Sequence, residues 1–596
     1  MRNVGDRLIV ASGVLLLAVA AEGATLFVSA NLTTGANDGS SWANAFQGTL
    51  GLQDALATAM PGDSVWVSAG VYHTGVSGDQ VAGFHLPNDV GVYGGFAGTE
   101  AMLSERDVQA NITTLSGDLD DDDTPAGFVG LNAHHVVVSD GGGAGTLLDG
   151  FHVEGGVSQC CGFISSQGGG VQLISGELTV RNCTFARNHA SRFGGDIAAM
   201  GSAITIESCL FTGTSQGDFG GHAVLVDDPC AGIVRDCQFV GAPPTTGGNA
   251  GIGIYANTTA PAGLLVEDCY FSIETVQFTC PAGVGMHVRP GTFATVRRCT
   301  FDTNLTCGGG GGIHCDGTGV IDRCLFIANE GQADGGAALF SFDGLMTVTN
   351  CVFAGNDRHG FSTVHLGGET HFYNCTFFNN GSADPKVFGV HRVITYQDAP
   401  STFDNCVFWD NESTQPGQLA VIAHSSFFAE PTFDNCLVQD WDGTFAGVNN
   451  FSADPRFADP LGPDLVKGTR DDNLSLAPGS PCIDRGDSTV LPIGVAEDFA
   501  GNARFVDVIT HADMGVPNGM GATVDLGALE APADFPAACP GDANGSTTVD
   551  LVDLNLVLFN FGSMVAPGAS GDVDYSGTVD LVDLNLVLFN FGSACS

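Results

Sequence analysis

The sequence predicts an all-β fold of stacked coils, a parallel β-helix, followed by a small helical module that binds calcium. Three observations lead to this prediction. A short segment centred on a cysteine recurs ten times, Gly makes up 85 of the 596 residues, and an acidic loop occurs twice near residue 550. Hydrophobic residues make up 44% of the chain and charged residues only 14%, so a long core can be filled.

The repeated segment has the form VRNCTFARN at 180–188 and VTNCVFAGN at 348–356, and its cysteine recurs every 24 to 32 residues. Its alternating runs have the period of β-strands rather than helices. Units of this length bury their apolar faces on one another and form a solenoid. We therefore expect the cysteine, and the residue two positions later, usually Phe, to point inward and stack in columns.

The column cysteines are expected to be buried thiols, because neighbours about 4.8 Å apart with parallel side chains would strain a disulfide. They are Cys183, Cys209, Cys237, Cys269, Cys299, Cys324, Cys351, Cys375, Cys406 and Cys436. In an oxidising compartment some of the cysteines outside the column could pair. These are Cys160, Cys161, Cys230, Cys280, Cys307 and Cys315.

The net charge and the N-terminal residues predict which partners the protein lacks and where it is located. With 19 basic and 66 acidic residues the net charge is −47, which excludes nucleic acid as a partner. Arg2 and Arg7 precede an apolar stretch at 8–20, which predicts a signal peptide over 1–23, with a retained N-terminal anchor as the alternative. The stretch is shorter than the ~20 residues of a spanning helix, so we expect no transmembrane insertion. The protein is expected to be secreted, either extracellular or associated with the cell surface.

The FxxN elements, as in FARN and FAGN, and the glycine-rich elements, as in GGGV at 168–171, resemble the repeats of polymorphic outer membrane proteins and related bacterial right-handed β-helix surface proteins. The resemblance implies a right-handed parallel β-helix with a cap and first coils at 24–145, repeats at 146–452 and a closing segment at 453–530. Leu52, Leu56 and Ala59 have the spacing of an amphipathic helix that closes the open end. The membrane barrel that ends the polymorphic proteins is not expected here.

A linker at 531–538 leads to a module at 539–596, in which TVDLVDLNLVLFNFGS occurs at 548–563 and again at 578–593. Oxygen-bearing side chains at alternate positions before each copy follow the pattern of a twelve-residue calcium loop, although acidic turns without metal are the alternative. The first loop has Asp542, Asn544, Ser546, Thr548, Asp550 and Asp553, and the second has Asp572, Asp574, Ser576, Thr578, Asp580 and Asp583. Cys539 and Cys595 flank the module and are expected to form a disulfide.

The two loops, each closed by Asp and followed by one helix, resemble a type I dockerin, the module that docks secreted enzymes onto cohesin scaffolds. The resemblance implies two calcium ions and a cohesin-type partner. The first ion would be held by Asp542, Asn544, Ser546, Asp553 and the carbonyl of Thr548, and the second by Asp572, Asp574, Ser576, Asp583 and the carbonyl of Thr578. The chain departs from the pattern where polar residues usually contact cohesin, with Leu551, Val552, Leu581 and Val582 instead.

Several polar side chains stand next to inward apolar residues after the glycine-rich elements and are expected to face outward in one column. They are Tyr255, His287, His314, His365 and His391, with Arg289 and Asp316 on the same face. Such a groove resembles, in architecture only, the surface on which β-helix polysaccharide enzymes work, whereas an ordinary polar surface is the alternative. The acidic run at 118–123 is expected to be a solvated loop rather than a cation site.

Two functions remain. The first is an exported, calcium-binding β-helix protein that presents an extended binding face, for polysaccharide or cell-envelope material, and is attached to a scaffold or surface through the dockerin-like module. The second is a dockerin-borne polysaccharide lyase or glycoside hydrolase. We favour the first because the repeats contain no acid/base signature. No carboxylate pair can be assigned at a glycosidase separation, so no catalytic residue is named.

Overall fold

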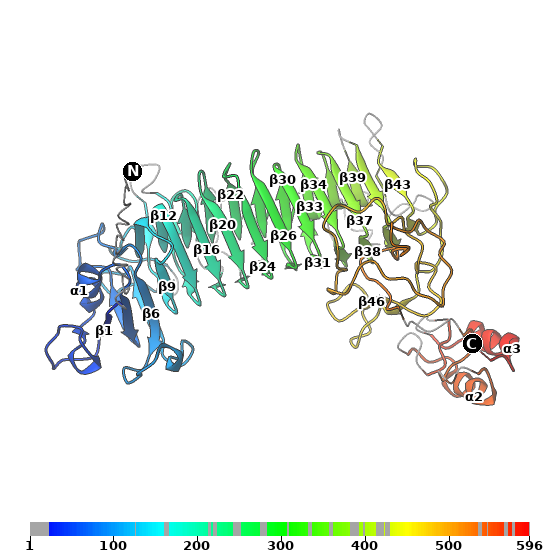
Figure 1. Cartoon of the computed structure of the whole chain (residues 1–596), viewed down its shortest axis with the longest axis horizontal. Coiled ribbons are helices and arrows are strands. Elements are labelled where there is room, and N and C mark those ends of the chain that lie inside the picture. The colour runs from blue at the N-terminus through cyan, green and yellow to red at the C-terminus, as the bar shows by residue number, and fades with distance from the viewer. Residues whose placement is uncertain are drawn as a thin grey trace, which may run out of the picture.

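The computed structural model describes residues 23–596 except for 125–126, 160–165, 213–215, 218–222, 242–251, 274–282, 307–308, 332–335, 357–361, 382–391, 397–399, 413–421, 424–429, 534–538, 545, 547, 566–569, 575–577 and 595–596. The described chain winds into a long stack of parallel coils, with a helix at its N-terminal end and a pair of helices beyond its other end (Figure 1). This arrangement confirms the predicted parallel β-helix.

The coils contribute strands to three parallel sheets. The first sheet contains β1 (Thr25–Ser29), β2 (Phe46–Gln47), β3 (Ser64–Ser68), β6 (Gly91–Phe96), β9 (Leu147–Asp149), β12 (Val171–Arg181), β16 (Ala203–Glu207), β20 (Ala231–Arg235), β23 (Leu264–Glu267), β26 (Phe293–Arg297), β30 (Thr318–Asp322), β34 (Leu345–Thr349), β37 (Thr370–Tyr373), β40 (Ser401–Asp404) and β43 (Thr432–Asp434). The second sheet, which shares the long β12, contains β5 (Phe84–Leu86), β8 (Val137–Gly142), β15 (Ile197–Ala199), β19 (Val224–Asp227), β22 (Ile254–Asn257), β25 (Met286–Val288), β29 (Ile313–Cys315), β33 (Gly336–Ser341), β36 (Ser362–Leu366), β39 (Arg392–Tyr396) and β42 (Ile422–Ala423).

The third sheet contains β4 (Gly70–His73), β7 (Thr113–Ser116), β10 (His152–Glu154), β13 (Thr184–Ala186), β17 (Leu210–Phe211), β21 (Gln238–Gly241), β24 (Tyr270–Ile273), β27 (Thr300–Asp302), β31 (Leu325–Ile327), β35 (Val352–Ala354), β38 (Thr376–Phe378), β41 (Val407–Trp409) and β44 (Leu437–Val438). Short parallel pairings involve β11 (Val157–Ser158), β14 (His189–Ala190), β18 (Gln216–Gly217), β28 (Leu305–Thr306) and β32 (Glu330–Gly331).

The predicted inward columns are present. Phenylalanines of the third sheet stack from coil to coil with ring centroids 4.5–5.1 Å apart. The stack consists of Phe185, Phe211, Phe239, Phe271, Phe301, Phe326, Phe353, Phe377 and Phe408. The ten column cysteines are buried and free, as expected. Burial raises the pKa of the Cys324 and Cys351 thiols, so these side chains behave as small hydrophobes rather than nucleophiles.

The Asn of the FxxN element forms a third inward column. Asn329 Nδ2 donates to Asn356 Oδ1 at 2.9 Å, and Asn356 Nδ2 donates to Asn380 Oδ1 at 3.0 Å in the next coil. Each amide oxygen also accepts a main-chain N–H, as Asn356 Oδ1 does from Asn329 N at 3.0 Å. Where the motif has this Asn, its side chain therefore satisfies main-chain groups of the buried turn after Phe, which explains the preference for Asn there.

The two ends of the stack are closed differently. At the N-terminal end helix α1 (Gly51–Thr58) buries Leu52, Ala55 and Leu56, which confirms the predicted cap. Two short 3-10 helices, η1 (Trp42–Asn44) and η2 (Leu103–Glu105), lie in the same region. At the other end, the closing segment folds back over the last coils. It contains the antiparallel pair β45 (Phe457–Asp459) and β46 (Asn473–Leu476).

The closing segment covers the outward residues of the last strands of the third sheet, from β31 to β44. Leu474 and Leu526 belong to one buried cluster with Ile327, Val352 and Phe378 of the sheet. Beyond the segment, helices α2 (Leu551–Asn560) and α3 (Leu581–Asn590) pack against each other. Among the helices that the structure describes, none combines the length and apolar character needed to cross a bilayer.

The closing segment also contains a buried cluster of acidic side chains. Asp484 and Asp525 are buried, and Asp525 Oδ1 accepts the main-chain N–H of Asp484 at 2.7 Å. Burial, reinforced by the Asp525 charge, raises the pKa of Asp484 to about 7. Burial likewise raises the pKa of Asp525 to about 6. At a pH between about 4 and 6, these two carboxyl groups therefore stay protonated in the folded protein, whereas in the unfolded chain, with Asp pKa values of about 3.9, they would release their protons.

We expect the Phe326→Ala variant to lose about 3–5 kcal/mol of unfolding free energy, because it leaves a cavity between Phe301 and Phe353 in the ring stack. Phe342→Ala is the matched control, since this side chain is 56% exposed and should cost less than about 0.5 kcal/mol. Denaturant unfolding of both variants measures the difference. Equal losses in the two variants would show that the ring stack does not contribute more to stability than an exposed ring does.

We also expect the stability of the closing segment to fall as pH rises. The folded pKa of Asp484, about 7, lies above the unfolded value, so protonation stabilises the fold. Its contribution is fully present below pH ~4, is lost between pH ~4 and ~7, and levels off above. Thermal unfolding of Asp484→Asn across this range should show a weaker pH dependence than the native chain, whereas the exposed Asp464→Asn should keep it. Parallel pH profiles of native protein and Asp484→Asn would contradict this assignment.

Candidate functional site

The outer face of the first sheet carries a ladder of alternating charges. Acidic and basic residues on consecutive strands are paired in register along it. Two of the ion pairs measure 2.5 Å, from Arg181 Nε to Asp149 Oδ2, and 2.8 Å, from Arg297 Nε to Glu267 Oε2. Several of the few cations of this acidic chain are thus gathered and neutralised on one face. The ladder consists of Asp149, Arg181, Glu207, Arg235, Glu267, Arg297 and Asp322.

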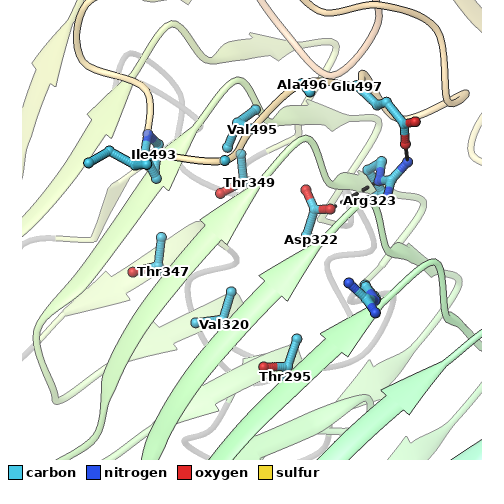
Figure 2. Close-up of a pocket in the computed structure, with 13 residues that line it drawn as sticks. Thr295, Val320, Asp322, Arg323, Thr347, Thr349, Ile493, Val495, Ala496 and Glu497 are labelled. Atoms are coloured by element: carbon cyan, nitrogen blue, oxygen red, sulfur yellow. Dashed lines mark hydrogen bonds and ion pairs between the residues drawn. The ribbon is translucent and has the colours of Figure 1, made fainter. Parts of the chain in front are cut away.

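A groove lies where the closing segment crosses the end of this charge ladder. Residues 492–497 pass over the outer face of β26, β30 and β34 and enclose a volume of about 430 Å³ (Figure 2). The sheet side offers the hydroxyls of Thr295 and Thr347, and the loop side offers the apolar side chains of Ile493 and Val495. A pocket of this size and mixed lining suits a small polar ligand or one part of a longer one.

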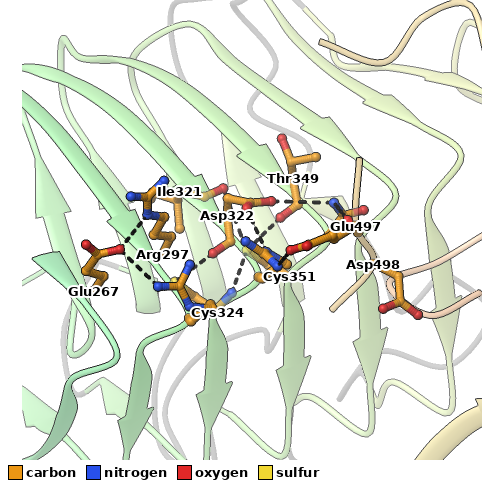
Figure 3. A network of polar contacts seen from close by, with 12 residues as sticks. Glu267, Arg297, Ile321, Asp322, Cys324, Thr349, Cys351, Glu497 and Asp498 are labelled. Atoms are coloured by element: carbon orange, nitrogen blue, oxygen red, sulfur yellow. Dashed lines mark hydrogen bonds and ion pairs between the residues drawn. The ribbon is translucent and has the colours of Figure 1, made fainter. Parts of the chain in front are cut away.

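Arg323 ties the loop to the sheet. Its Nε donates to Asp322 Oδ2 at 3.0 Å, and its guanidinium also pairs with Glu497 (Figure 2). Figure 3 shows Asp322 and Glu497 in the same network of polar contacts. Asn350 Nδ2 donates to the main-chain oxygen of Glu497 at 2.9 Å. Burial raises the pKa of Asp322, although the neighbouring Arg323 opposes the shift. An acidic group with a raised pKa in a pocket is a candidate for ligand binding or proton transfer.

Strand register places most of the predicted outward column side by side. Tyr255 pairs with His287 and His287 with His314, on β22, β25 and β29. The next position on β33 is Phe340, followed by His365 on β36. The sequence did not reveal Phe340, because a register irregularity in β33 shifts this residue into the column.

The column differs from the prediction in its exposure. The side chains point away from the coil core, yet Tyr255, His287, His314 and His365 are 9%, 3%, 9% and 5% exposed. The prediction that these residues line an open groove is therefore wrong. His391 lies outside the residues that the structure describes.

Asp316 joins two histidines of this column. His287 Nε2 lies 3.2 Å from Asp316 Oδ2, and His314 Nε2 lies 2.9 Å from Asp316 Oδ1. Burial raises the pKa of Asp316, but the two histidine contacts outweigh it and hold that pKa well below its usual range. Burial lowers the pKa of His287, and Arg289 is close enough to lower it further. Arg289 and Asp316 thus lie where the sequence predicted, beside the column.

The second predicted calcium loop brings three carboxylates together. One oxygen each of Asp572, Asp574 and Asp583 lies within 4.8 Å of the others. Asp583 is buried, and its Oδ1 accepts the main-chain N–H groups of Val573 at 2.7 Å and Asp574 at 3.1 Å. Burial, with the Asp574 charge, raises the pKa of Asp583. Clustered like charges of this kind are stabilised by a bound cation.

The first loop has the same frame. Asp553 is buried, and its Oδ2 accepts the Asp550 N–H at 2.7 Å, as Asp583 Oδ2 does from Asp580. The oxygens of Asp542 and Asn544 point toward one amide, that of Ser546, at 3.0 and 2.8 Å. Thr548 and Thr578 stand two residues before the helix caps Asp550 and Asp580, whereas Ser576 lies outside the described residues.

Both helices of the module expose apolar side chains. Phe559 is 89% exposed and Phe589, its copy in the second helix, is 86% exposed. The leucine and valine at the start of each helix are exposed as well. Two similar apolar patches on one small module indicate a surface for protein contact.

Cys539 is disulfide-bonded, while its predicted partner Cys595 lies outside the described residues, so the pairing stays a prediction.

In the acidic run, the carboxylate of Asp118 accepts the main-chain N–H groups of Asp120 and Asp123, at 3.2 and 3.0 Å. These carboxylate oxygens organise their own loop.

The coils, the inward columns and the sheet register define a parallel β-helix protein. A family model described as a right-handed β-helix region matches residues 127–276, 202–377 and 262–454, which together cover more than half of the chain. The chain therefore belongs to the right-handed β-helix family.

Other comparisons add little about activity. No curated protein sequence matches the chain. One solved structure with a similar fold is titled "Crystal structure of pectate lyase Pel9A"; it is 12% identical, with a TM-score of 0.37, and the alignment covers 86% of this chain and 97% of that one. A similarity of this degree says nothing about what this chain binds.

We expect the Arg323→Ala variant to loosen residues 492–497. Amide hydrogen exchange in this loop should rise by a factor of about two to five, which corresponds to the up to about 1 kcal/mol that a partly exposed ion pair contributes. Arg235→Ala removes a ladder arginine that pairs with Glu207, and should leave exchange in the loop unchanged. Unchanged exchange in Arg323→Ala would show that the loop is held by other contacts.

Proposed function

We propose that the protein is an exported, calcium-binding β-helix protein that binds polysaccharide or cell-envelope material along its sheet face and is attached to a scaffold or surface through its C-terminal module. The observation that carries the proposal is the duplicated loop with its converging carboxylates, of which Asp572, Asp574 and Asp583 are the clearest case. Oxygen donors at alternate positions are the ligands that calcium prefers.

The residues present fit calcium. Asp542, Asn544, Ser546 and Asp553, with the Thr548 carbonyl, would hold one ion, and the equivalent residues of the second loop, with Ser576 and the Thr578 carbonyl, would hold the other. Calcium would supply positive charge that offsets the mutual repulsion of these carboxylates and joins each loop to the start of its helix. A module of this size buries little core, as its cluster around Val549, Val557, Val579 and Val587 indicates, so calcium binding is expected to contribute much of its folding energy.

Attachment is assigned to the exposed faces of α2 and α3. The side chains before each loop-closing Asp, Leu551 and Val552 or Leu581 and Val582, are between 51% and 60% exposed. Because these positions are apolar, a cohesin-type partner of this module would present an apolar surface rather than a polar one.

Ligand binding is assigned to the charge ladder and the groove beside it. A ladder of paired charges offers hydrogen-bond donors and acceptors along the stack, at the spacing of the coils. Threonine hydroxyls and the Asp322–Arg323 pair extend these donors and acceptors into the groove. The net charge of −47 opposes polyanions, so neutral polysaccharide is the favoured ligand.

Export rests on the sequence of residues 1–23, most of which lie outside the described part of the chain. A positively charged start, with Arg2 and Arg7, and a short apolar stretch support a cleaved signal and hence a secreted or surface-associated protein.

A second candidate is a polysaccharide lyase or glycoside hydrolase. The observation in its favour is the groove itself, where Asp322 has a raised pKa and Glu497 lies across Arg323 from it. New reducing ends or unsaturated uronates from a polysaccharide would distinguish this candidate from a binding protein.

We expect calcium titration of the full-length protein to show two ions per chain, and Asp583→Asn to lose one of them, because Asp583 closes the second loop. Asp580→Asn is the matched control: Asp580 caps α3 through the Val582 N–H at 2.7 Å, and Asn caps helices equally well. Isothermal calorimetry gives the stoichiometry, and protease sensitivity of the tail in EGTA reports folding. An unchanged stoichiometry in Asp583→Asn would overturn the calcium assignment.

A further inference from the structure

A compact group of two imidazoles and a carboxylate lies on the outer side of the second sheet. His287 on β25 and His314 on β29 occupy neighbouring coils with ring centroids 4.5 Å apart. Asp316 follows β29, and one ligand atom of each of these three residues lies within 4.8 Å of the others. The side chains of His287, His314 and Asp316 are 4%, 11% and 14% exposed. The calcium loops and the groove leave this group without a role.

A neutral His314 ring has too few N–H groups for its two neighbours. Its Nδ1 faces the main-chain oxygen of Gly309 at 3.4 Å, and its Nε2 faces Asp316 Oδ1 at 2.9 Å. Both neighbours are acceptors, whereas a neutral imidazole carries one N–H. When Nδ1 donates to the carbonyl, Nε2 directs a lone pair at the carboxylate, and a positive charge is needed between them.

His287 directs its own Nε2 at the same carboxylate. The Nε2–Oδ2 distance is 3.2 Å, and the buried Nδ1 of His287 has no hydrogen-bond partner among the described residues. The two rings lie against each other at a tilt of 42°, so adding a second proton to each would put two positive charges side by side. A single cation bound between the two Nε2 atoms and Asp316 would accept a lone pair from each Nε2 and offset the Asp316 charge, and the Nδ1 proton of His314 would face the Gly309 oxygen.

We propose that His287, His314 and Asp316 form a binding site for a divalent transition metal of the zinc type. Imidazole nitrogens with a carboxylate oxygen are a donor set of zinc, cobalt, nickel and copper, whereas calcium prefers oxygen alone. Ligand atoms about 2.0–2.1 Å from a tetrahedral zinc are about 3.3 Å from one another. The distances from His314 Nε2 to Asp316 Oδ1, 2.9 Å, and from His287 Nε2 to Asp316 Oδ2, 3.2 Å, are of this size. The site is distinct from the calcium loops in place and in chemistry.

The metal would link neighbouring coils. His287 comes from one coil and His314 and Asp316 come from the next, so a shared ion adds a bond across the stack to the main-chain ladder. His365 lies in the same column, but among the described residues it belongs to no group of three possible metal ligands. It therefore provides a control with the same residue type and column.

The test uses the full-length protein in excess calcium, which saturates the C-terminal loops. After incubation with zinc and dialysis, elemental analysis should find one zinc ion per chain. His314→Gln should bind zinc at least tenfold more weakly, while His365→Gln and Asp583→Asn should keep the zinc. Replacing zinc by Co²⁺ should give the intense visible absorption of a nitrogen-ligated ion.

Two results would overturn the proposal: absence of zinc from the folded native chain, which would leave an imidazolium–carboxylate pair, or full zinc retention in His314→Gln. If that variant does not fold, X-ray absorption on the native zinc-loaded protein decides instead. Scattering from two imidazoles supports the site, and sulfur ligands would assign the zinc to cysteines.

Discussion

The stacking of one coil on the next in a fixed parallel register is the constraint on which the rest of this structure depends. Parallel strands lie about 4.8 Å apart, so the same position in every repeat lands above its counterpart. Phe326 stacks between Phe301 and Phe353 for this reason, and Asn329 meets Asn356. A residue that occupies the same position in every repeat therefore forms a column, and each repeat adds its contacts with the next one.

The same rule creates the regular outer surfaces of the coils. On the first sheet, alternating charges form a ladder in which Arg235 pairs with Glu207 and Arg297 with Glu267. On the second sheet, aromatic and histidine rings form a row of neighbours in contact that is buried rather than open. The groove arises only where residues 492–497 cross the ladder. Regular coils thus supply periodic chemistry, and the closing segment supplies the one enclosed volume assigned to ligand binding.

The sequence predicted what repeats determine. The Cys and Phe columns, the cap helix around Leu52 and Leu56, and the loop frame around Asp583 all follow from local spacing. Contacts between distant segments were not predictable in this way, and Glu497 against Arg323 is the clearest example. The positions of the charge ladder could have been predicted, since Arg181 and Glu207 each stand two positions before a column cysteine. The alternation of charge appears only when the strands are paired. The position of Phe340 could not be predicted, because a local irregularity in β33 breaks the spacing of the repeat.

The most direct test of the central claim exposes the full-length, calcium-loaded protein to a panel of neutral and acidic polysaccharides and measures retention and product in the same samples. The account predicts retention on a neutral polysaccharide, with reducing ends and unsaturated uronates no higher than in a heat-denatured control. Product formation above that control would contradict it and make the groove at Asp322 and Glu497 an active site.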